Sequence, residues 1–463
     1  MKPIYQYIWA LGGITLALSC QSAKEVYPGQ QQVEVAYRNA IATDSSSVAT
    51  LPWQEFFQDD YVKCLIEEGI ANNLDLKIGL TRIDAAQAVV SQAKASFLPD
   101  VNVGGSLQRT RASYPQSFGF FKYATLHEVA ATSTWELDVW GKLASSKRSA
   151  YYQLLKTKAA KQAIQTQLVA QIAHYYYELL LLDKQLRIVE RTLENRAQDV
   201  STMKQLKKAN LTTEAAVVQS EANYLDAQIT RPAIQKQIQE VENALSILLG
   251  RTGGTIERGT IEEQLPPSQM KVGVPAQLLQ NRPDVRVEEL ALAAYFEDVK
   301  VAKRSFYPSI TINASVGYSS YDVKEWFTPT GLFAQLTAGL LQPIFGKRQN
   351  QTKLAVAKAT YQEQIYRFQQ KVLEASKEVS NALLAYEIAD EQQQLRQKQV
   401  EKLALAVDYT KKLMLYNQKT TYTDVLTSEQ AYLYAELEMA HNELEKWLAT
   451  IQLYRSLGGG WLP

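Results

Sequence analysis

One short passage occurs twice in the 463-residue chain. It reads FLPDVNVGGSLQRTR over residues 97–111 and FYPSITINASVGYSS over residues 306–320. Each copy begins with an aromatic residue, a hydrophobic residue and a proline, and then alternates apolar with polar residues. In both places the passage directly follows a helical pattern. A chain that makes this helix-to-strand transition twice is expected to fold as two related halves.

Further matches extend the repeat along the chain. The matched residues keep one order and a nearly constant separation, as three pairs illustrate: Pro99 and Pro308, Gly141 and Gly346, Leu249 and Leu457. A tandem duplication accounts for this pattern, and its period is too long for a small solenoid repeat. We assign residues 53–258 to the first unit and residues 259–463 to the second. Each unit is expected to contain a short helix, two strands and a long helical hairpin.

Alternation of apolar and polar residues predicts four β-strands. They lie near residues 101–111, 127–140, 309–321 and 331–343. Each is about ten residues long, apolar on one face and small and polar on the other, which is typical of strands in a membrane β-barrel. Four strands cannot enclose an aqueous pore, so several chains would have to contribute to one barrel. The alternative is a soluble sheet that packs on a helical core.

Two very long helices are predicted between the strands and the chain's hairpin turns. The first runs from Lys142 to about Lys208, and the second from Lys347 to about Tyr416. At about 1.5 Å per residue, each would extend for roughly 100 Å, which suits a coiled-coil tube or a long bundle. Thr212 or Thr213 is the expected cap of the helix that follows the first. A cytoskeletal or adhesin-like stalk is the alternative to a tube.

The N-terminus predicts export. Residues 1–19 contain a short apolar run that ends in small residues, which is typical of a signal peptide. The run ends at Cys20 in ALSC, similar to the site at which bacterial lipoproteins are cleaved and acylated, for example with palmitate. Residues 20–52 would then be a lipidated linker. The alternative is plain export, with Cys20 lost with the signal. Cys64 lies in a helical pattern and is expected to be buried.

Composition and motifs exclude several classes of protein. The 49 Lys and Arg residues nearly balance the 48 Asp and Glu residues, so no nucleic-acid partner is expected. Two cysteines and three histidines form neither a disulfide framework nor a zinc cluster. His127 begins HEVAA but lacks the second histidine of a zinc protease helix, and no Gly-rich phosphate loop is visible. We therefore expect no enzymatic activity, no metal and no cofactor.

Several motifs resemble the outer-membrane efflux protein family, the TolC-like channels, and within it the OprM-type lipoprotein branch. The similar segments cover nearly the whole mature chain: LPWQEFFQDDYVKCLIEEGIANNLDL from Leu51, WELDVWGK from Trp135, LLQNRPDVRVEE from Leu278, SFYPSI from Ser305 and PIFGKRQN from Pro343. The resemblance implies an α+β fold of long helices and four strands per chain. Three chains would form a twelve-stranded barrel in the outer membrane of a Gram-negative bacterium, above a periplasmic helical tunnel.

The resemblance also implies a function and partners. The chain would be the exit duct of a tripartite efflux system that exports small molecules such as drugs. It would form a homotrimer, contact outer-membrane lipid, and dock on a periplasmic adaptor (membrane fusion) protein and an inner-membrane pump of the RND type. Two alternatives remain at this point: a channel for type I protein secretion, and a non-conducting envelope stalk.

Two groups of residues have roles in this scheme. The first group marks the junctions between helices and barrel: Pro99, Gly141, Pro308 and Gly346. The second would close the periplasmic end, where the family places an aspartate in a segment that matches TTYTDVLTSEQAY here: Asp424, Tyr416, Lys419 and Thr427. Three copies of Asp424 around one axis would attract cations and repel one another. The equivalent position in the first half is Ala216. A solvated helical carboxylate is the alternative for Asp424.

Overall fold

The structure, a computed structural model, describes residues 51–118, 120, 122–264, 281–417 and 420–462. All of them lie within residues 34–463, which form one unit of the chain. The signal peptide, Cys20 and most of the linker lie outside the described residues. The elements are α2 (Trp53–Phe56), α3 (Asp60–Asn72), α4 (Leu74–Ala95), β1 (Asp100–Arg111), α5 (Tyr114–Ser117), β2 (Tyr123–Leu137), α6 (Lys142–Lys208), α7 (Glu214–Leu248), η2 (Ile261–Glu263), α9 (Pro283–Arg304), β3 (Ser309–Ser320), η4 (Val323–Glu325), η5 (Pro329–Gly331), β4 (Leu332–Leu341), α10 (Gln349–Asn417) and α11 (Tyr422–Ser456).

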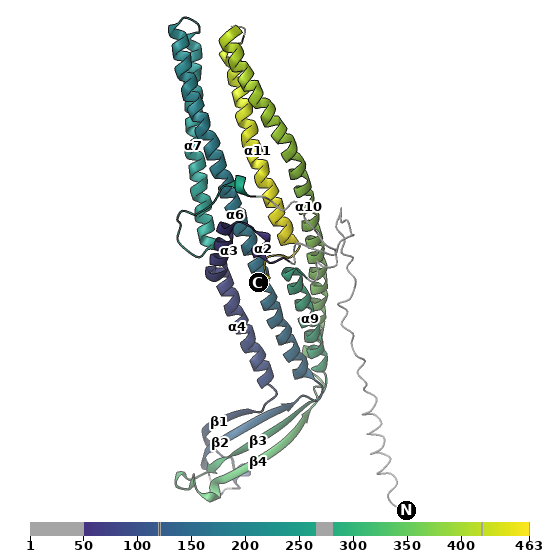
Figure 1. The fold of residues 1–463 in the computed structure, drawn as a ribbon. Coiled ribbons are helices and arrows are strands. Elements are labelled where there is room, and N and C mark those ends of the chain that lie inside the picture. The colour runs from purple at the N-terminus through teal and green to yellow at the C-terminus, as the bar shows by residue number, and fades with distance from the viewer. Residues whose placement is uncertain (1–50, 119, 121, 265–280, 418–419, 463) are drawn as a thin grey trace, which may run out of the picture. The chain divides into compact units, whose positions relative to one another are not determined.

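Two long helical hairpins account for most of the fold (Figure 1). One consists of α6 and α7 and the other of α10 and α11; their turns lie together at one end, and the strands lie at the other. Thr213 caps α7, because its hydroxyl accepts a hydrogen bond from the Ala216 N–H at 3.4 Å. The predicted fold class, long helices with four strands in two related halves, is confirmed.

The four strands form one antiparallel sheet in the order β1-β2-β3-β4. Its register aligns like residues across all four strands. One row consists of Val103, Ala131, Val316 and Ala334, and a neighbouring row of Asn102, Thr132, Ser315 and Gln335. Because successive residues of a strand point to opposite faces, the sheet has one apolar and one polar face.

Two strands end before the alternation predicts. β2 covers Tyr123–Leu137 rather than 127–140, because the Asp138 carboxylate turns back to cap α6. Its oxygens accept hydrogen bonds from the Leu143 and Ala144 N–H groups, both at 2.8 Å. β4 ends at Leu341 rather than 343, where Pro343 cannot donate to a ladder.

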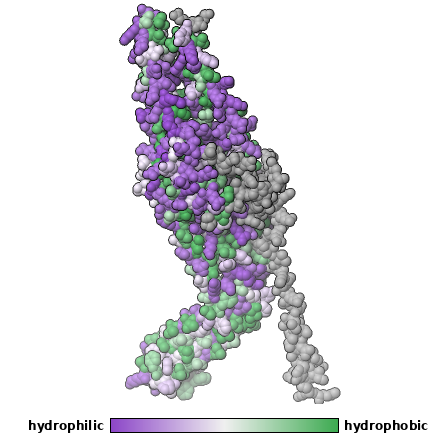
Figure 2. Space-filling view, viewed as in Figure 1, coloured by the Kyte–Doolittle hydropathy of each residue, from purple (hydrophilic) through white to green (hydrophobic). Residues whose placement is uncertain are grey.

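The main core lies where the hairpins meet α2 and α3. Aromatic rings fill it: Tyr177 stacks on Trp447 with centroids 4.1 Å apart, and Phe56 stacks on Tyr454 at 4.0 Å. The expectation that Cys64 is buried is wrong, because it lies on the exposed side of α3. Figure 2 shows hydrophobic residues gathered over the sheet and hydrophilic residues over the hairpins. Along the described residues, none of the helices is both long and apolar enough to cross a membrane.

Arg282 joins the second half's first helix to the end of the chain. Its buried guanidinium donates to the Ser456 carbonyl at 2.9 Å and to the Asp284 carboxylate at 2.7 and 3.0 Å. It also lies 2.9 Å from the Glu378 carboxylate. Burial alone would raise the pKa of Asp284, but the Arg282 guanidinium outweighs it and holds this pKa below its usual range.

Replacing Arg282 is therefore expected to be costly. Arg282→Ala leaves two carboxylates and a carbonyl without their buried partner, and we expect a loss of about 3–5 kcal/mol in the free energy of unfolding. Urea unfolding in detergent measures this. Arg286→Ala on the same helix removes an exposed arginine and should change stability by less than about 0.5 kcal/mol. Equal effects of the two substitutions would contradict the assignment.

Candidate functional site: strand junctions, sheet faces and hairpin tips

The junction between β2 and α6 is closed by contacts from the second half. The Trp140 ring stacks on Tyr307 with centroids 5.2 Å apart, and its Nε1 donates to the Pro308 carbonyl at 2.7 Å. Gly141 has a φ of 74°, in the left-handed region that glycine adopts without steric cost. Arg304 donates to the Gly141 carbonyl at 2.6 Å. Trp140 and Gly141 are thus held by residues 304–308, which form the helix-to-strand junction of the second half.

The second junction, between β4 and α10, differs from the first. Gly346 does not take the left-handed conformation; Lys347 and Arg348 do, with φ of 49° and 65°. α10 accordingly begins at Gln349 rather than at Lys347. Ile344 and Phe345 beside it are 95% and 86% exposed. This junction therefore lacks the cover that Tyr307 gives to Trp140.

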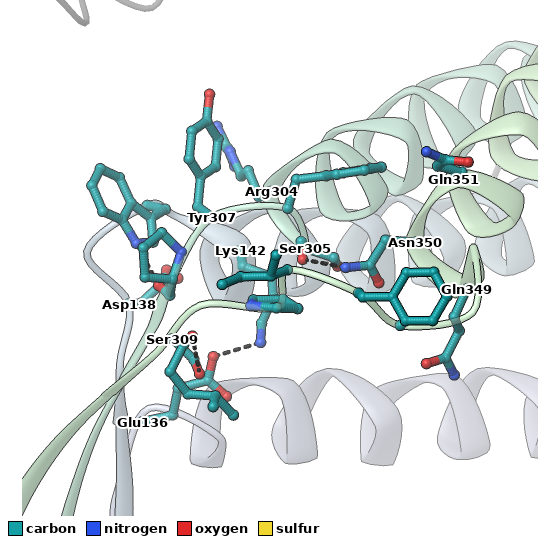
Figure 3. Close-up of a pocket in the computed structure, with 18 of the residues that line it drawn as sticks. Glu136, Asp138, Lys142, Arg304, Ser305, Tyr307, Ser309, Gln349, Asn350 and Gln351 are labelled. Carbon is teal, nitrogen blue, oxygen red and sulfur yellow. Dashed lines mark hydrogen bonds and ion pairs between the residues drawn. The ribbon is translucent and has the colours of Figure 1, made fainter.

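A cleft of about 570 Å³ lies between the two junctions (Figure 3). Glu136, Lys142, Arg304 and Asn350 are among the residues that line it. Most of its polar groups already have partners: Lys142 pairs with Glu136 at 2.5 Å, and the Asn350 amide donates to the Ser305 carbonyl at 2.8 Å. Pro99 precedes β1, where the neighbouring Phe97 carbonyl accepts a hydrogen bond from Trp135 at 2.9 Å. These contacts connect the ends of the strands to the neighbouring helix ends.

The apolar face of the sheet is open. Among its residues, Val103, Leu336 and Leu340 are 79%, 75% and 68% exposed. Exposed aromatic residues lie in the loops at the strand ends: Tyr114, Phe118, Phe120, Tyr321 and Phe327. Apolar residues in such numbers on a surface mark a contact with lipid or protein, and aromatic residues at the edges suit a membrane interface.

Three of the predicted gate residues, Tyr416, Asp424 and Thr427, lie near the turn of the second hairpin. Lys419 lies outside the described residues, and the Tyr416 side chain is 87% exposed. The Asp424 carboxylate accepts hydrogen bonds from the Thr421 N–H at 2.7 Å and from its hydroxyl at 2.8 Å. These bonds close a capping box at the start of α11 and lower the pKa of Asp424. Thr427 donates to the Thr423 carbonyl at 2.9 Å.

In the structure, then, the bonds that Asp424 and Thr427 make lie within the first turns of α11. The capping role has a local signal that sequence reasoning missed: threonine followed three residues later by an acidic residue is the pattern of a capping box. Asp424 can cap α11 and still act as a gate residue, because its carboxylate is exposed and remains charged.

The profile of the outer membrane efflux protein family matches residues 65–251 and 274–459. The chain belongs to this family. The two matched segments are the two halves of the duplication, and the resemblance seen in the motifs is confirmed. The protein is an outer-membrane efflux channel of the kind that serves tripartite pumps, and neither protein secretion nor a non-conducting stalk gains support.

Individual relatives of this efflux channel agree over almost its full length. The cation efflux system protein CusC of Escherichia coli is 27% identical over 457 residues, which cover 97% of each chain. The probable outer membrane lipoprotein SilC of Salmonella typhimurium is 24% identical over 460 residues, 98% of this chain and 97% of that protein. The solved structure of the outer-membrane channel OprN has the same fold, with a TM-score of 0.85 and 24% identity, over 93% of this chain and 97% of that one.

A second group of charges in the efflux channel lies near the hairpin tips and was not predicted. Asp199 of α6 and Glu429 of α11 are largely buried side by side, and Lys411 of α10 lies between them. The Lys411 Nζ is 2.6 Å from the Glu429 carboxylate and 3.7 Å from that of Asp199. Burial and the negative charge of Glu429 raise the pKa of Asp199 to about 6, while Lys411 and Arg196 oppose the shift. This group joins the two hairpins.

The stability of the efflux channel is therefore expected to depend on pH through Asp199. A carboxyl whose pKa is higher in the folded state binds its proton more tightly there. Folding is thus favoured when Asp199 is protonated, and stability falls as pH rises from about 4, the value for an unfolded chain, to about 6, by on the order of 2 kcal/mol. Asp199→Asn should flatten this dependence, as followed by thermal unfolding between pH 4 and 8. Asp226→Asn changes an exposed carboxyl of α7 and is the matched control; an unchanged slope in Asp199→Asn would refute the assignment.

Proposed function

We propose that three copies of the chain form one exit duct. Each copy gives four strands to a twelve-stranded barrel in the outer membrane and its helices to a tunnel in the periplasm. An inner-membrane pump of the RND type, linked by a periplasmic adaptor protein, delivers substrates to the hairpin tips. The cargo consists of small molecules such as drugs; cations are a second candidate, because CusC is a cation efflux protein and is similar over the full length.

One observation carries the proposal of a shared barrel. β1 and β4 are the edges of the sheet, so one backbone side of each has no partner strand in the described chain. Lipid cannot satisfy these N–H and carbonyl groups, and only a closed ring of strands removes the edges. The exposed apolar face, with Val103, Leu336 and Leu340, suits the lipid side of such a ring, and the polar face suits an aqueous lumen.

The hairpin tips supply a candidate gate. Three copies of Asp424 near the axis would place three negative charges at the narrow end, with Tyr416, Lys419 and Thr427 as neighbours. Such a ring of carboxylates attracts cations, and its three negative charges repel one another. Neighbouring side chains that hold the three carboxylates close together would therefore keep the duct closed. The charge of each carboxylate is already stabilised within its own chain by the Thr421 donors.

Conductance in a planar bilayer tests the duct and the gate together. The purified protein should give small, long-lived, cation-selective events. Asp424→Ala removes both the charge and the helix cap, whereas Asp424→Asn removes the charge and retains an acceptor for the Thr421 N–H. A charge ring predicts higher conductance and lower cation selectivity in both variants. A change in Asp424→Ala alone would assign Asp424 to capping. Unchanged conductance and ion selectivity in both variants would refute Asp424 as a gate residue.

We also propose that Cys20 anchors the mature chain in the outer membrane through acyl chains. The support is the ALSC sequence and the similarity to SilC, a probable outer membrane lipoprotein. A single acyl chain holds a membrane only weakly, so the barrel strands would share the anchoring. Cys20→Ser should abolish labelling with radioactive palmitate while the mature chain still reaches the membrane. Equal labelling of the variant and the unaltered chain would exclude Cys20 as the acylation site.

A further inference from the structure

Charged residues of the sheet are separated by sign between its two faces. The four strands carry five Asp, Glu, Lys or Arg residues in all. Because side chains alternate between faces, the register places every acidic one on the polar face: Asp100, Glu128 and Glu136. The two basic ones, Arg109 and Arg111, lie on the apolar face. Along the described strands, the apolar face therefore carries positive charge alone.

A third cation joins the two arginines at the end of β1 that leads into the loop. Arg111 pairs with Tyr123 across the hairpin, two residues beyond Arg109. Lys122 directly precedes β2, and its carbonyl accepts a hydrogen bond from the Ala112 N–H at 3.1 Å. The Tyr123 ring lies 5.7 Å from the Arg109 guanidinium and 6.0 Å from the Lys122 Nζ. Both distances allow a cation–π contact, so one ring gathers two cations.

These three residues, Arg109, Arg111 and Lys122, form what we call the loop-end cation group, and its charge is not balanced. Residues 101–127 contain neither Asp nor Glu. Within the part of the chain that the structure describes, none of the three cations is paired with a carboxylate, and all three side chains are exposed. Like charges gathered in this way repel one another. An anion bound among them would remove the repulsion.

The second half of the chain shows that the hairpin itself does not require these cations. The shift that relates Pro99 to Pro308 places Tyr318 and Ser320 of β3 at the positions of the two arginines. The loop between β3 and β4 contains charges of both signs: Asp322, Lys324 and Glu325. The duplicated strands thus tolerate neutral residues where β1 has arginine. The loop-end cation group is a feature of the first hairpin and calls for an explanation other than strand pairing.

The position of the group along β1 suits the far edge of an apolar membrane layer. β1 begins at Asp100 beside the helices, so its arginines lie at the end away from them (Figure 1). Arg109 follows Val101 by eight residues, or about 27 Å along a strand. At a tilt of about 40° this spans roughly 20 Å of an apolar band that is about 25 Å tall. Arg109 and Arg111 therefore fall at the interface, where lipid headgroups lie.

We propose that the loop-end cation group binds a phosphate group of the outer-leaflet lipid. The outer leaflet of an outer membrane consists of a glycolipid whose lipid A headgroup carries phosphates. A guanidinium donates two parallel hydrogen bonds to a phosphate, and the Lys122 ammonium adds a point charge. Val103 and Leu107, on the same face of β1, are 79% and 68% exposed and offer a surface to the acyl chains of the same lipid. The inference rests on the proposed barrel, since it needs this face in lipid.

Native mass spectrometry of the delipidated full chain in detergent tests the site. The two probes are lipid A with both phosphate groups and lipid A from which both have been removed. The unaltered chain should bind the phosphorylated probe at least about ten-fold more tightly, because the two probes share their acyl chains and differ in charge. Equal binding of the two probes would overturn the inference. This comparison needs no substitution and so does not depend on the folding of a variant.

Substitutions locate the bound phosphate. Arg109→Gln with Arg111→Gln should weaken binding of the phosphorylated probe by about ten- to thirty-fold. Lys324→Gln is the matched control, because it removes an exposed cation from the corresponding loop, and binding should not change. Unaltered binding in the double variant, or an equal loss in Lys324→Gln, would overturn the placement at the loop-end cation group.

A competitor distinguishes lipid from free phosphate. An excess of inorganic phosphate should leave most of the lipid bound, because inorganic phosphate has no acyl chains to lie on Val103 and Leu107. Complete displacement would assign the cations to free phosphate and overturn the lipid site.

Light scattering of the same samples separates this inference from the proposed barrel. If the chain is trimeric but binds both lipid probes equally, the lipid site fails and the shared barrel stands. A monomeric chain would overturn the shared barrel, and the lipid site with it.

Discussion

Backbone hydrogen bonding is the constraint on which the rest of this structure depends. A strand in lipid must have a partner on both sides, because no water is present to satisfy its N–H and carbonyl groups. The sheet of this chain satisfies its two inner strands and leaves β1 and β4 as edges. The apolar and polar rows that cross all four strands are kept in register by the same ladder. The two edge strands are therefore the part of the chain that the proposed assembly of copies would complete.

The long helices connect the sheet to the hairpin tips, and a group of contacts holds them at each end. Trp140, Tyr307 and Arg304 hold one junction, so the direction of the β2 strand is tied to the start of α6. At the far end, Asp199, Lys411 and Glu429 tie the first hairpin to the second. The first group combines two aromatic rings with the Arg304 guanidinium, and the second is ionic and belongs to the hairpins, over which hydrophilic residues gather. A change of pH near 6 would therefore act on the Asp199 group, which joins the two hairpins.

Periodic features were predictable from the sequence, and contacts between distant segments were not. Alternation predicted the four strands and the twofold match predicted the two halves, because both depend on spacing alone. The two long helices follow from the long proline-free stretches after Lys142 and Lys347. Three features were missed for physical reasons. β2 ends at Leu137 because the Asp138 carboxylate caps α6. Alternation of apolar and polar residues does not indicate that a strand residue will cap the next helix instead. α10 begins at Gln349 rather than at Lys347, because Lys347 and Arg348 have positive φ and form the turn before the helix. The carboxyl pair of Asp199 and Glu429 lies on helices more than two hundred residues apart, and no local pattern marks either residue.

The core also joins the beginning and the end of the described chain. Phe56 stacks on Tyr454, and the Tyr454 hydroxyl donates to the Leu51 carbonyl at 2.8 Å. Residues near position 51 are synthesised early, and Tyr454 is among the last ten residues of the 463. Contacts of such long sequence separation form late and slowly. The two ends of the described chain therefore complete this part of the core together, and a chain that stops short of Tyr454 would leave Phe56 without its stacking partner.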